Sequence, residues 1–392
     1  MRYWTLGILA LSGFVTSFGA HIVATNLPSY AEGVGVGAFT IGLLIAVYDF
    51  AELFAKPAAG FVADRYGMKR MLLAGLVVFI FGSALFLIIP PGLLLLVRFV
   101  QGLGAAALST ISITLVARYF AAARGRAFGI YNAIKGAGYV IAPAAGGFLT
   151  HQYGFRMIFI VSAAVGLVAL ALSLFLPGDR GAGDTLADDD DLSFAQFITV
   201  FRDRRLLPIY AVIVINMFMV GILFGFLPVY LHGLGYTARQ SGTLLSVCTA
   251  AYLLIQPVAG MLADRWNSRT TVMAGLLVAA LAVLTVTFTS GALLVGVVVL
   301  AGIGVGTVWT NSDALIAVLA TPAKLGASVG AAQSFKEFGD MVGPLLVGAL
   351  TQFYGVRTGF VTCGALALLV VTPLMRSGAL GVDSTASSAP LP

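Results

Sequence analysis

The stretch GIYNAIKGAGYVIAPAAGGFLTHQYGFR at residues 129–156 returns 201 positions later as GAAQSFKEFGDMVGPLLVGALTQFYGVR at residues 330–357. A second pair, GFVADRYGMKR at 60–70 and GMLADRWNSR at 260–269, is shifted by 200. The identical pairs in the longer stretch are Gly129/Gly330, Lys135/Lys336, Gly138/Gly339, Pro143/Pro344, Gly147/Gly348, Leu149/Leu350, Thr150/Thr351, Tyr153/Tyr354, Gly154/Gly355 and Arg156/Arg357. The chain therefore contains two copies of one structural unit.

The composition indicates a membrane protein. Of the 392 residues, 59% are hydrophobic and 10% are charged, whereas soluble domains carry about 25% charged residues. The 47 glycines suit close helix packing in a bilayer. Cys248 and Cys363 are isolated in apolar segments, so neither a disulfide nor a metal site is predicted. No phosphate-binding loop and no catalytic constellation occurs, so we expect no cofactor, no ATP use and no enzyme activity.

Twelve segments are long and apolar enough to cross a bilayer, which needs about 20 residues. They lie near 4–27, 38–60, 71–89, 92–118, 127–149, 156–176, 207–230, 240–262, 271–289, 292–319, 327–350 and 357–376. We read the first as an uncleaved helix rather than a signal peptide. The sequence predicts an all-α membrane protein.

The loops differ in charge. One face would carry fifteen basic residues, which are Arg2, Arg65, Lys69, Arg70, Arg118, Arg124, Arg126, Arg180, Arg202, Arg204, Arg205, Arg265, Arg269, Lys324 and Arg376. The other face would carry three, Arg156, Arg239 and Arg357. The positive-inside rule then predicts that both termini are cytoplasmic. The net charge of +6 follows this topology, so it does not indicate nucleic-acid binding.

The domain boundaries follow from the duplication. We predict six-helix bundles at 1–177 and 206–376, a cytoplasmic linker at 178–205, and a disordered tail at 377–392. The Asp run of the linker reads as a solvated spacer rather than a cation site. Two tandem bundles imply a pseudo-two-fold axis along the membrane normal, a site near the midplane, and rocking of the halves.

Over essentially its whole length, the chain resembles the major facilitator superfamily, in particular its proton-coupled drug antiporters. Residues at the positions of the family's loop signature are Gly60, Asp64, Arg65, Gly67, Lys69 and Arg70, with Met68 in place of a basic residue; a partial copy has Gly260, Asp264 and Arg265. RFVQG at 98–102 resembles the fourth-helix signature. GYVIAPAAGG at 138–147 resembles the antiporter signature, with Ala142 in place of a glycine. The resemblance implies alternating access and links Arg98 to proton coupling.

The loop signature suggests a gate. Asp64 can accept hydrogen bonds from a helix N-terminus or pair with Arg118, and this latch would break in the other state. The alternative is a simple cytoplasmic turn. Pro143 and Pro344 are expected to kink their helices, which either serves gating or only makes a packing groove.

The stretch YDFAELFAKP at 48–57 places Asp49 near the midplane, with Glu52 on the same helical face. Ionisable residues at that depth are costly and usually face a cavity. A carboxylate in apolar surroundings can take up and release a proton near neutral pH. Lys56 is expected to extend to the interface. The alternative is a structural ion pair with a lysine.

A second cluster, KEFGD, lies at 336–340. Lys336 and Asp340 can pair along one helical face, and Glu337 points elsewhere. The repeat-related Lys135 and Lys336 would either form an anion site or each neutralise a carboxylate, with Asp49 or Glu52 as the partner of Lys135.

Inside the spans the carboxylates outnumber the bases by two, which favours proton coupling. The counted residues are Asp49, Glu52, Asp313, Glu337 and Asp340 against Arg98, Lys135 and Lys336. Further residues expected to bind substrate are Asn26, Asn132, Trp309, Asn311, Asp313 and Gln333. His21 reads as a packed polar residue rather than a proton relay.

The sequence thus predicts a multi-pass, monomeric antiporter of a bacterial inner membrane. Its partners would be protons, lipid and a small organic or drug-like compound that it exports. Two alternatives stay open. One is an organic-anion or phosphate-ester exchanger that uses Lys135 and Lys336. The other is a lipid or amphiphile flippase.

Overall fold

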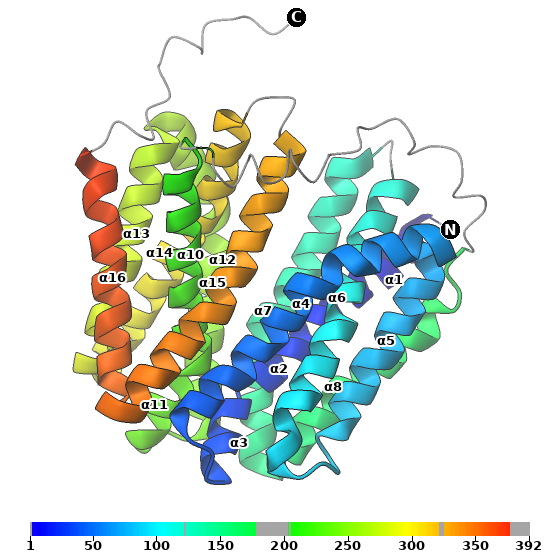
Figure 1. Ribbon diagram of the computed structural model, residues 1–392, viewed down its shortest axis with the longest axis horizontal. Coiled ribbons are helices and arrows are strands. Elements are labelled where there is room, and N and C mark those ends of the chain that lie inside the picture. Colours follow the sequence, from blue (N-terminus) through cyan, green and yellow to red (C-terminus); the bar gives the residue numbers. More distant parts are fainter. Residues whose placement is uncertain (1, 121–122, 178–202, 204, 321–324, 377–392) are drawn as a thin grey trace, which may run out of the picture. The chain divides into compact units, whose positions relative to one another are not determined.

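The computed structural model describes residues 2–120, 123–177, 203, 205–320 and 325–376, and within them it contains helices and no strand (Figure 1). The predicted tail at 377–392 lies outside the described residues. So does the predicted linker at 178–205, apart from Asp203 and Arg205.

The helices follow the predicted spans. In chain order they are α1 (Arg2–Phe14), α2 (Ala20–Ala24), α3 (Leu27–Gly33), α4 (Ala38–Tyr66), α5 (Met68–Leu85), α6 (Leu94–Tyr119), α7 (Arg124–Tyr153), α8 (Arg156–Ser173), α10 (Leu207–Gly225), α11 (Leu227–Gly233), α12 (Ala238–Arg265), α13 (Ser268–Thr285), α14 (Gly291–Leu319), α15 (Leu325–Tyr354) and α16 (Val356–Arg376). Nine helical segments of the described chain are long and apolar enough to span a bilayer. The shorter apolar helix Val356–Val371 and the 30-residue helices α7 and α15 complete the twelve predicted spans.

The first span is not one regular helix as the sequence suggested. A π-helical turn, η1 (Val15–Gly19), separates α1 from α2, and a break at Thr25 and Asn26 separates α2 from α3. Short π segments inside helices are rare and occur frequently at functional sites. The break precedes Pro28, which has no amide hydrogen and fits the first turn of α3.

The helices pack into two compact units. Unit 1 contains the described residues of Met1–Asp189, Gly221–Ala250 and Asp340–Gly359, and unit 2 contains those of Asp190–Val220, Ala251–Gly339 and Phe360–Pro392. In unit 1, α6 packs against both α4 and α5, α5 against α8, and α1 against α7. The buried core of unit 1 includes Leu72, Phe79, Leu108 and Leu115. In unit 2, α13 packs along α14.

Helices α4 and α15 cross within unit 1 so closely that their backbones are in direct contact. A Cβ atom built on Gly42 would overlap the carbonyl oxygen of Pro344. On the opposite side of the crossing, a Cβ atom on Gly348 would lie 2.8 Å from the carbonyl oxygen of Ala38. Glycine at both positions therefore allows the two backbones to touch.

Helices α7 and α12 form the matching crossing, also within unit 1. A Cβ atom on Gly242 would overlap the carbonyl oxygen of Pro143, and one on Gly147 would overlap that of Ala238. These four residues are the repeat equivalents of the four at the first crossing, at shifts of 200 or 201. The duplication thus produces two equivalent contacts between helices of the first and second repeat. Both prolines lie inside continuous helices, with their carbonyl oxygens at the crossings.

The signature loop after α4 makes its turn through a backbone conformation that favours glycine. Gly67 has φ 101°, and its repeat equivalent Asn267 has φ 154°. Asn267 offsets this strain because its Oδ1 accepts a hydrogen bond from the amide of Arg269 at 2.7 Å.

The basic residues of the same loop tie it to neighbouring helix ends. Lys69 Nζ donates to the carbonyl oxygens of Leu174 and Leu176, at 2.8 and 2.6 Å, just beyond α8. A cation at a helix C-terminus is favourable, because carbonyl oxygens there lack helical partners. Arg118 Nη1 lies 3.5 Å from the sulfur of Met68. The side chain of Asp64 lies outside the described residues, so its predicted latch with Arg118 stays a prediction.

Candidate functional site

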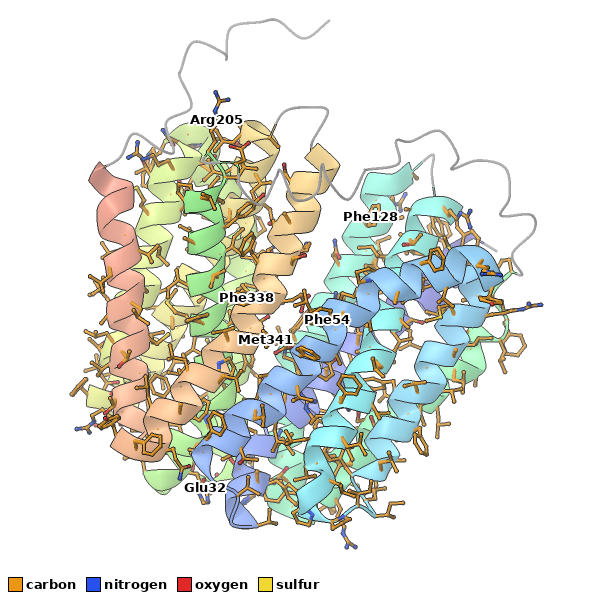
Figure 2. All side chains as sticks on the ribbon, in the orientation of Figure 1. Glu32, Phe54, Phe128, Arg205, Phe338 and Met341 are labelled. Atoms are coloured by element: carbon orange, nitrogen blue, oxygen red, sulfur yellow. The ribbon has the colours of Figure 1, made fainter. Side chains whose placement is uncertain are left out.

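Helix α4 carries a charged pair on its inner face. Glu52 Oε2 lies 2.5 Å from Lys56 Nζ, and their side chains are 13% and 28% exposed. The ammonium group of Lys56 folds back by one helical turn onto Glu52, which is the structural ion pair that the sequence analysis gave as the alternative. The opposite face of α4 is aromatic: Phe50 and Phe54 pack with ring centroids 4.7 Å apart, and Phe54 is exposed (Figure 2). The charged face of α4 is thus the face turned toward the protein.

Arg98 on α6 is buried in unit 1 beside this pair, with 1% of its surface exposed. Its Nε donates to the carbonyl oxygen of Leu44 at 3.2 Å, and its guanidinium lies 4.3 Å from the ring centre of Tyr48. The charges of Asp49 and Glu52 act on it. Arg98 therefore joins α6 to the charged face of α4.

A chain of buried hydrogen bonds starts at Arg98. Arg98 Nη1 donates to Gln101 Oε1 at 2.7 Å, and Gln101 Nε2 donates to Ser83 Oγ at 3.1 Å. Ser83 and Ser162 hydroxyls lie 3.1 Å apart, and Ser162 Oγ donates to the carbonyl oxygen of Gly19 at 3.2 Å. The chain links α6, α5 and α8 to the last residue of the π-helical turn.

Gln101→Leu should lower the thermal stability of the protein, because it leaves Arg98 Nη1 and Ser83 Oγ without their shared partner. Loss of a buried hydrogen bond to a charged group costs about 1.5–3 kcal/mol. The melting temperature of the purified protein checks this. Ser109→Ala on the same helix is the control, since Ser109 Oγ bonds only its own helix, at Ala106, and is partly exposed. Equal melting temperatures for both variants would contradict the prediction.

His21, which the sequence analysis read as a packed polar residue, lies at the centre of these charges. Its Nδ1 is 2.9 Å from the carbonyl oxygen of Ser17, so Nδ1 carries the hydrogen. Its ring stands edge-on to Tyr139 at 4.4 Å and to Phe224 at 5.5 Å. The charges of Arg98, Glu52 and Lys135 act on it. No sequence signal placed His21 there, because the π-helical turn that precedes it was not predicted.

Lys135 lies half-buried on α7, close to the same turn of the first span. Its carbonyl oxygen accepts a hydrogen bond from Ser17 Oγ at 2.6 Å. The partner predicted for Lys135 was Asp49 or Glu52, but Glu52 is paired with Lys56. The charged cluster of unit 1 therefore consists of Asp49 and Glu52 near Arg98, with Lys56 paired to Glu52. The charges of Arg98, Glu52 and Lys135 also act on His21.

Unit 2 contains a separate charged pair. Lys336 Nζ donates to both carboxylate oxygens of Asp313 at 2.8 Å and lies 4.5 Å from the ring centre of Trp309. Trp309 in turn packs edge-on against Tyr252 at 5.8 Å. The sequence analysis named Asp340, one turn away on the same helix, as the partner of Lys336. The structure shows a partner that the sequence analysis did not name, because packing of α15 brings Lys336 to Asp313 on α14.

The other predicted site residues differ in how far their side chains are buried. Asn311 is fully buried and donates to the carbonyl oxygens of Ala259 and Thr307, so it joins helices rather than lining a cavity. Asn132 and Gln333 are exposed, and Glu337 and Asp340 are half-buried. Asp264 and Arg265 of the second loop copy are exposed.

Comparison with known proteins gives consistent matches over the whole chain. Residues 9–251 and 231–379 match the family described as Major Facilitator Superfamily. The chain is 27% identical over 379 residues to the multidrug resistance protein MdtG of Citrobacter koseri, with 92% of each chain covered.

Two solved structures have the same fold. The nucleoside transporter NupG has a TM-score of 0.82 at 14% identity, with 95% of this chain and 98% of NupG covered. A bacterial homologue of the human lysosomal transporter Spinster, inward-facing and unoccupied, has a TM-score of 0.83 at 15% identity, with 97% of both chains covered. At these identities the two structures establish the fold alone.

Proposed function

This chain belongs to the Major Facilitator Superfamily, and we propose that it exports small organic, drug-like compounds across a membrane in exchange for protons. Members of this family are multi-pass membrane transporters, not enzymes. The relative from Citrobacter koseri is named a multidrug resistance protein, which supports a drug-like substrate. The proposal goes beyond the family assignment in two respects, which are antiport and coupling to protons.

The observation that carries proton coupling is the buried cluster on α4 and α6. Asp49 and Glu52 lie one turn apart inside a membrane span, and their charges act on the buried Arg98. A charged group at this depth is expensive, and such groups usually take part in ion or proton movement. Protonation of a carboxylate here would change its attraction to Arg98 and Lys56. That change can bias two conformations of the protein, as exchange transport requires.

The anion-exchanger alternative is weakened by the pairing of Lys336. Both oxygens of Asp313 bind its ammonium group, so an anionic substrate would have to displace a carboxylate that is already held at 2.8 Å. A lysine that is neutralised in this way favours a cationic or neutral substrate over a phosphate ester.

The proposal is tested by drug-driven proton movement in vesicles. Reconstituted protein is loaded with a pH-sensitive dye, and ethidium is added outside. We expect an acid-inside pH gradient to drive ethidium uptake, accompanied by an outward flux of protons down their gradient. Asp49→Asn should lower the coupled flux at least tenfold, because the amide cannot exchange a proton, whereas ethidium binding at equilibrium should remain.

Glu32→Gln is the matched control, since this carboxylate on α3 lies with 45% of its side chain exposed, 3.8 Å from His232. It should leave the proton flux unchanged. Ethidium movement that is independent of the pH gradient would refute proton exchange. Equal losses in Asp49→Asn and Glu32→Gln would refute the assignment to the α4 cluster.

A further inference from the structure

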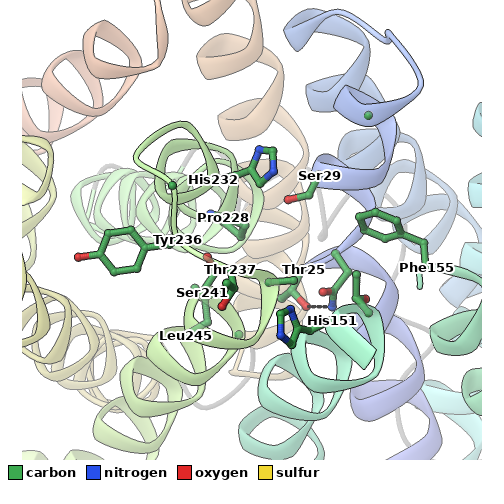
Figure 3. A pocket seen from close by; sticks show the side chains of 16 residues that line it. Thr25, Ser29, His151, Phe155, Pro228, His232, Tyr236, Thr237, Ser241 and Leu245 are labelled. Carbon is green, nitrogen blue, oxygen red and sulfur yellow. Dashed lines mark hydrogen bonds between the residues drawn. The ribbon is translucent and has the colours of Figure 1, made fainter. Parts of the chain in front are cut away.

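Unit 1 contains a cavity of about 490 Å³ beside the crossing of α7 and α12, apart from the charged cluster (Figure 3). Cavities of this volume are typical of small-molecule sites. Its small hydroxyl and amide side chains come from α3, α7, α12 and the connections next to α3 and α11. They are Thr25, Asn26, Ser29, Thr150, Thr237 and Ser241, and the lining also includes His151, His232 and Tyr236.

One of these side chains lacks a partner. Thr150 is 9% exposed, and its buried Oγ1 makes no hydrogen bond to any described residue. Leaving a buried hydroxyl in this state is unfavourable, and such groups ordinarily find a partner. Since Thr150 lines the cavity, a molecule inside it is placed to provide that partner.

The internal duplication shows that the fold does not require this polar lining. The turns around it keep identical residues in both repeats, including Pro28/Pro228, Gly33/Gly233, Gly35/Gly235 and Gly42/Gly242. Five polar residues of the lining, however, differ between the repeats. Thr25, Asn26, Ser29, Thr237 and Ser241 correspond to Gly225, Phe226, Val229, Gly37 and Ile41. The same architecture is therefore built with apolar residues at the equivalent positions.

The wall of the cavity is adapted to one of these polar residues. A Cβ atom on Gly146 would overlap Asn26 Nδ2, so glycine at this position makes room for the amide. In the second repeat the equivalent residue is Val347, and Phe226 stands in place of Asn26. Gly146 and Asn26 thus differ together from their repeat equivalents.

We propose that this cavity binds an uncharged small molecule that carries several hydroxyl groups and one flat or apolar face, such as a nucleoside or a sugar. Hydroxyl and amide side chains donate and accept hydrogen bonds without requiring charge. Phe155, Pro228 and Leu245 provide the apolar part of the wall. None of the sixteen lining residues is Asp, Glu, Lys or Arg, so a permanent ion would find no counter-charge in the lining.

Binding at this site is separate from the proposed proton exchange, and it is tested at equilibrium without a gradient. Uridine, sucrose and ethidium are titrated into the full-length protein in lipid nanodiscs, with the heat of binding as the readout. We expect uridine or sucrose to bind the wild type. Thr150→Val and Ser241→Ala should each weaken that binding about tenfold, as loss of a hydrogen bond does.

Thr351→Val is the matched control. Thr351 is the repeat equivalent of Thr150, and its buried hydroxyl also lacks a partner among the described residues. It should leave uridine and sucrose binding unchanged. The proposal is overturned if neither neutral probe binds at tens of millimolar, or if Thr150→Val and Thr351→Val weaken binding equally. It is also overturned if Thr150→Val and Ser241→Ala weaken ethidium binding alone.

Discussion

Gly42→Leu and Gly242→Leu should each prevent the helix crossings of unit 1 from forming and should stop transport. A leucine at either position meets the carbonyl oxygen of a proline on the crossing helix, and backbone cannot move aside as a flexible side chain can. Overpacking costs about 3 kcal/mol, which shifts a two-state equilibrium by about a hundredfold. The protein should then favour the conformation in which these crossings are open.

The shift is measured by labelling Ser241→Cys, which is 5% exposed beside the α7–α12 crossing, with a maleimide in each background. Native Cys248 and Cys363 are buried and give a low background. Labelling should rise in both leucine variants. Gly296→Leu is the control, because a Cβ atom there meets nothing within 4 Å. Unchanged labelling together with normal transport in Gly42→Leu would show that closing of this crossing is not part of the cycle.

Asp313→Asn should destabilise the protein, because it leaves the buried ammonium of Lys336 without a counter-charge. The side chain of Lys336 is 5% exposed and that of Asp313 is 46% exposed. Breaking a fully buried pair costs about 3–5 kcal/mol, and exposure of one partner reduces this to about 2–3 kcal/mol. Asp313→Glu, which keeps the charge, should lose less.

A double-mutant cycle separates the pair from other effects. Lys336→Met removes the charge and keeps much of the side-chain volume, so Lys336→Met with Asp313→Asn should be more stable than Asp313→Asn alone. The free energy of unfolding in denaturant gives the coupling. Strictly additive losses would mean that the contact seen between Nζ and the carboxylate contributes no stability.

The span pattern and the duplication were readable from the sequence because they depend on local properties. Hydrophobic runs of about 20 residues predict helices wherever a bilayer is the solvent, since backbone groups must then bond within the helix. All twelve spans are found. The π-helical turn at Val15–Gly19 was not predicted, because no residue type in it demands that geometry.

The partners of the charged residues could not be read from spacing alone. The sequence analysis considered pairs along one helix for Lys336 and named Asp340, whereas the structure shows that Asp313 on the next helix also binds its ammonium group. Conversely, the one-turn pair of Glu52 and Lys56 formed although an interfacial position was expected for Lys56. Along a helix, neighbours three or four residues apart compete with every helix that packs against the same face.

By itself, the sequence determined that the chain lies in a membrane, how many spans it has and that it contains an internal repeat. It also determined which charged residues lie inside the spans, where they are costly. The tertiary structure alone decided that Arg98 reaches Gly19 through Gln101, Ser83 and Ser162, and that Gly42 and Gly242 meet prolines of the other repeat. It also decided that Thr150 lines a cavity. The physical reason is that hydropathy acts on each helix separately, whereas hydrogen bonds and close backbone contacts depend on how helices rotate and cross.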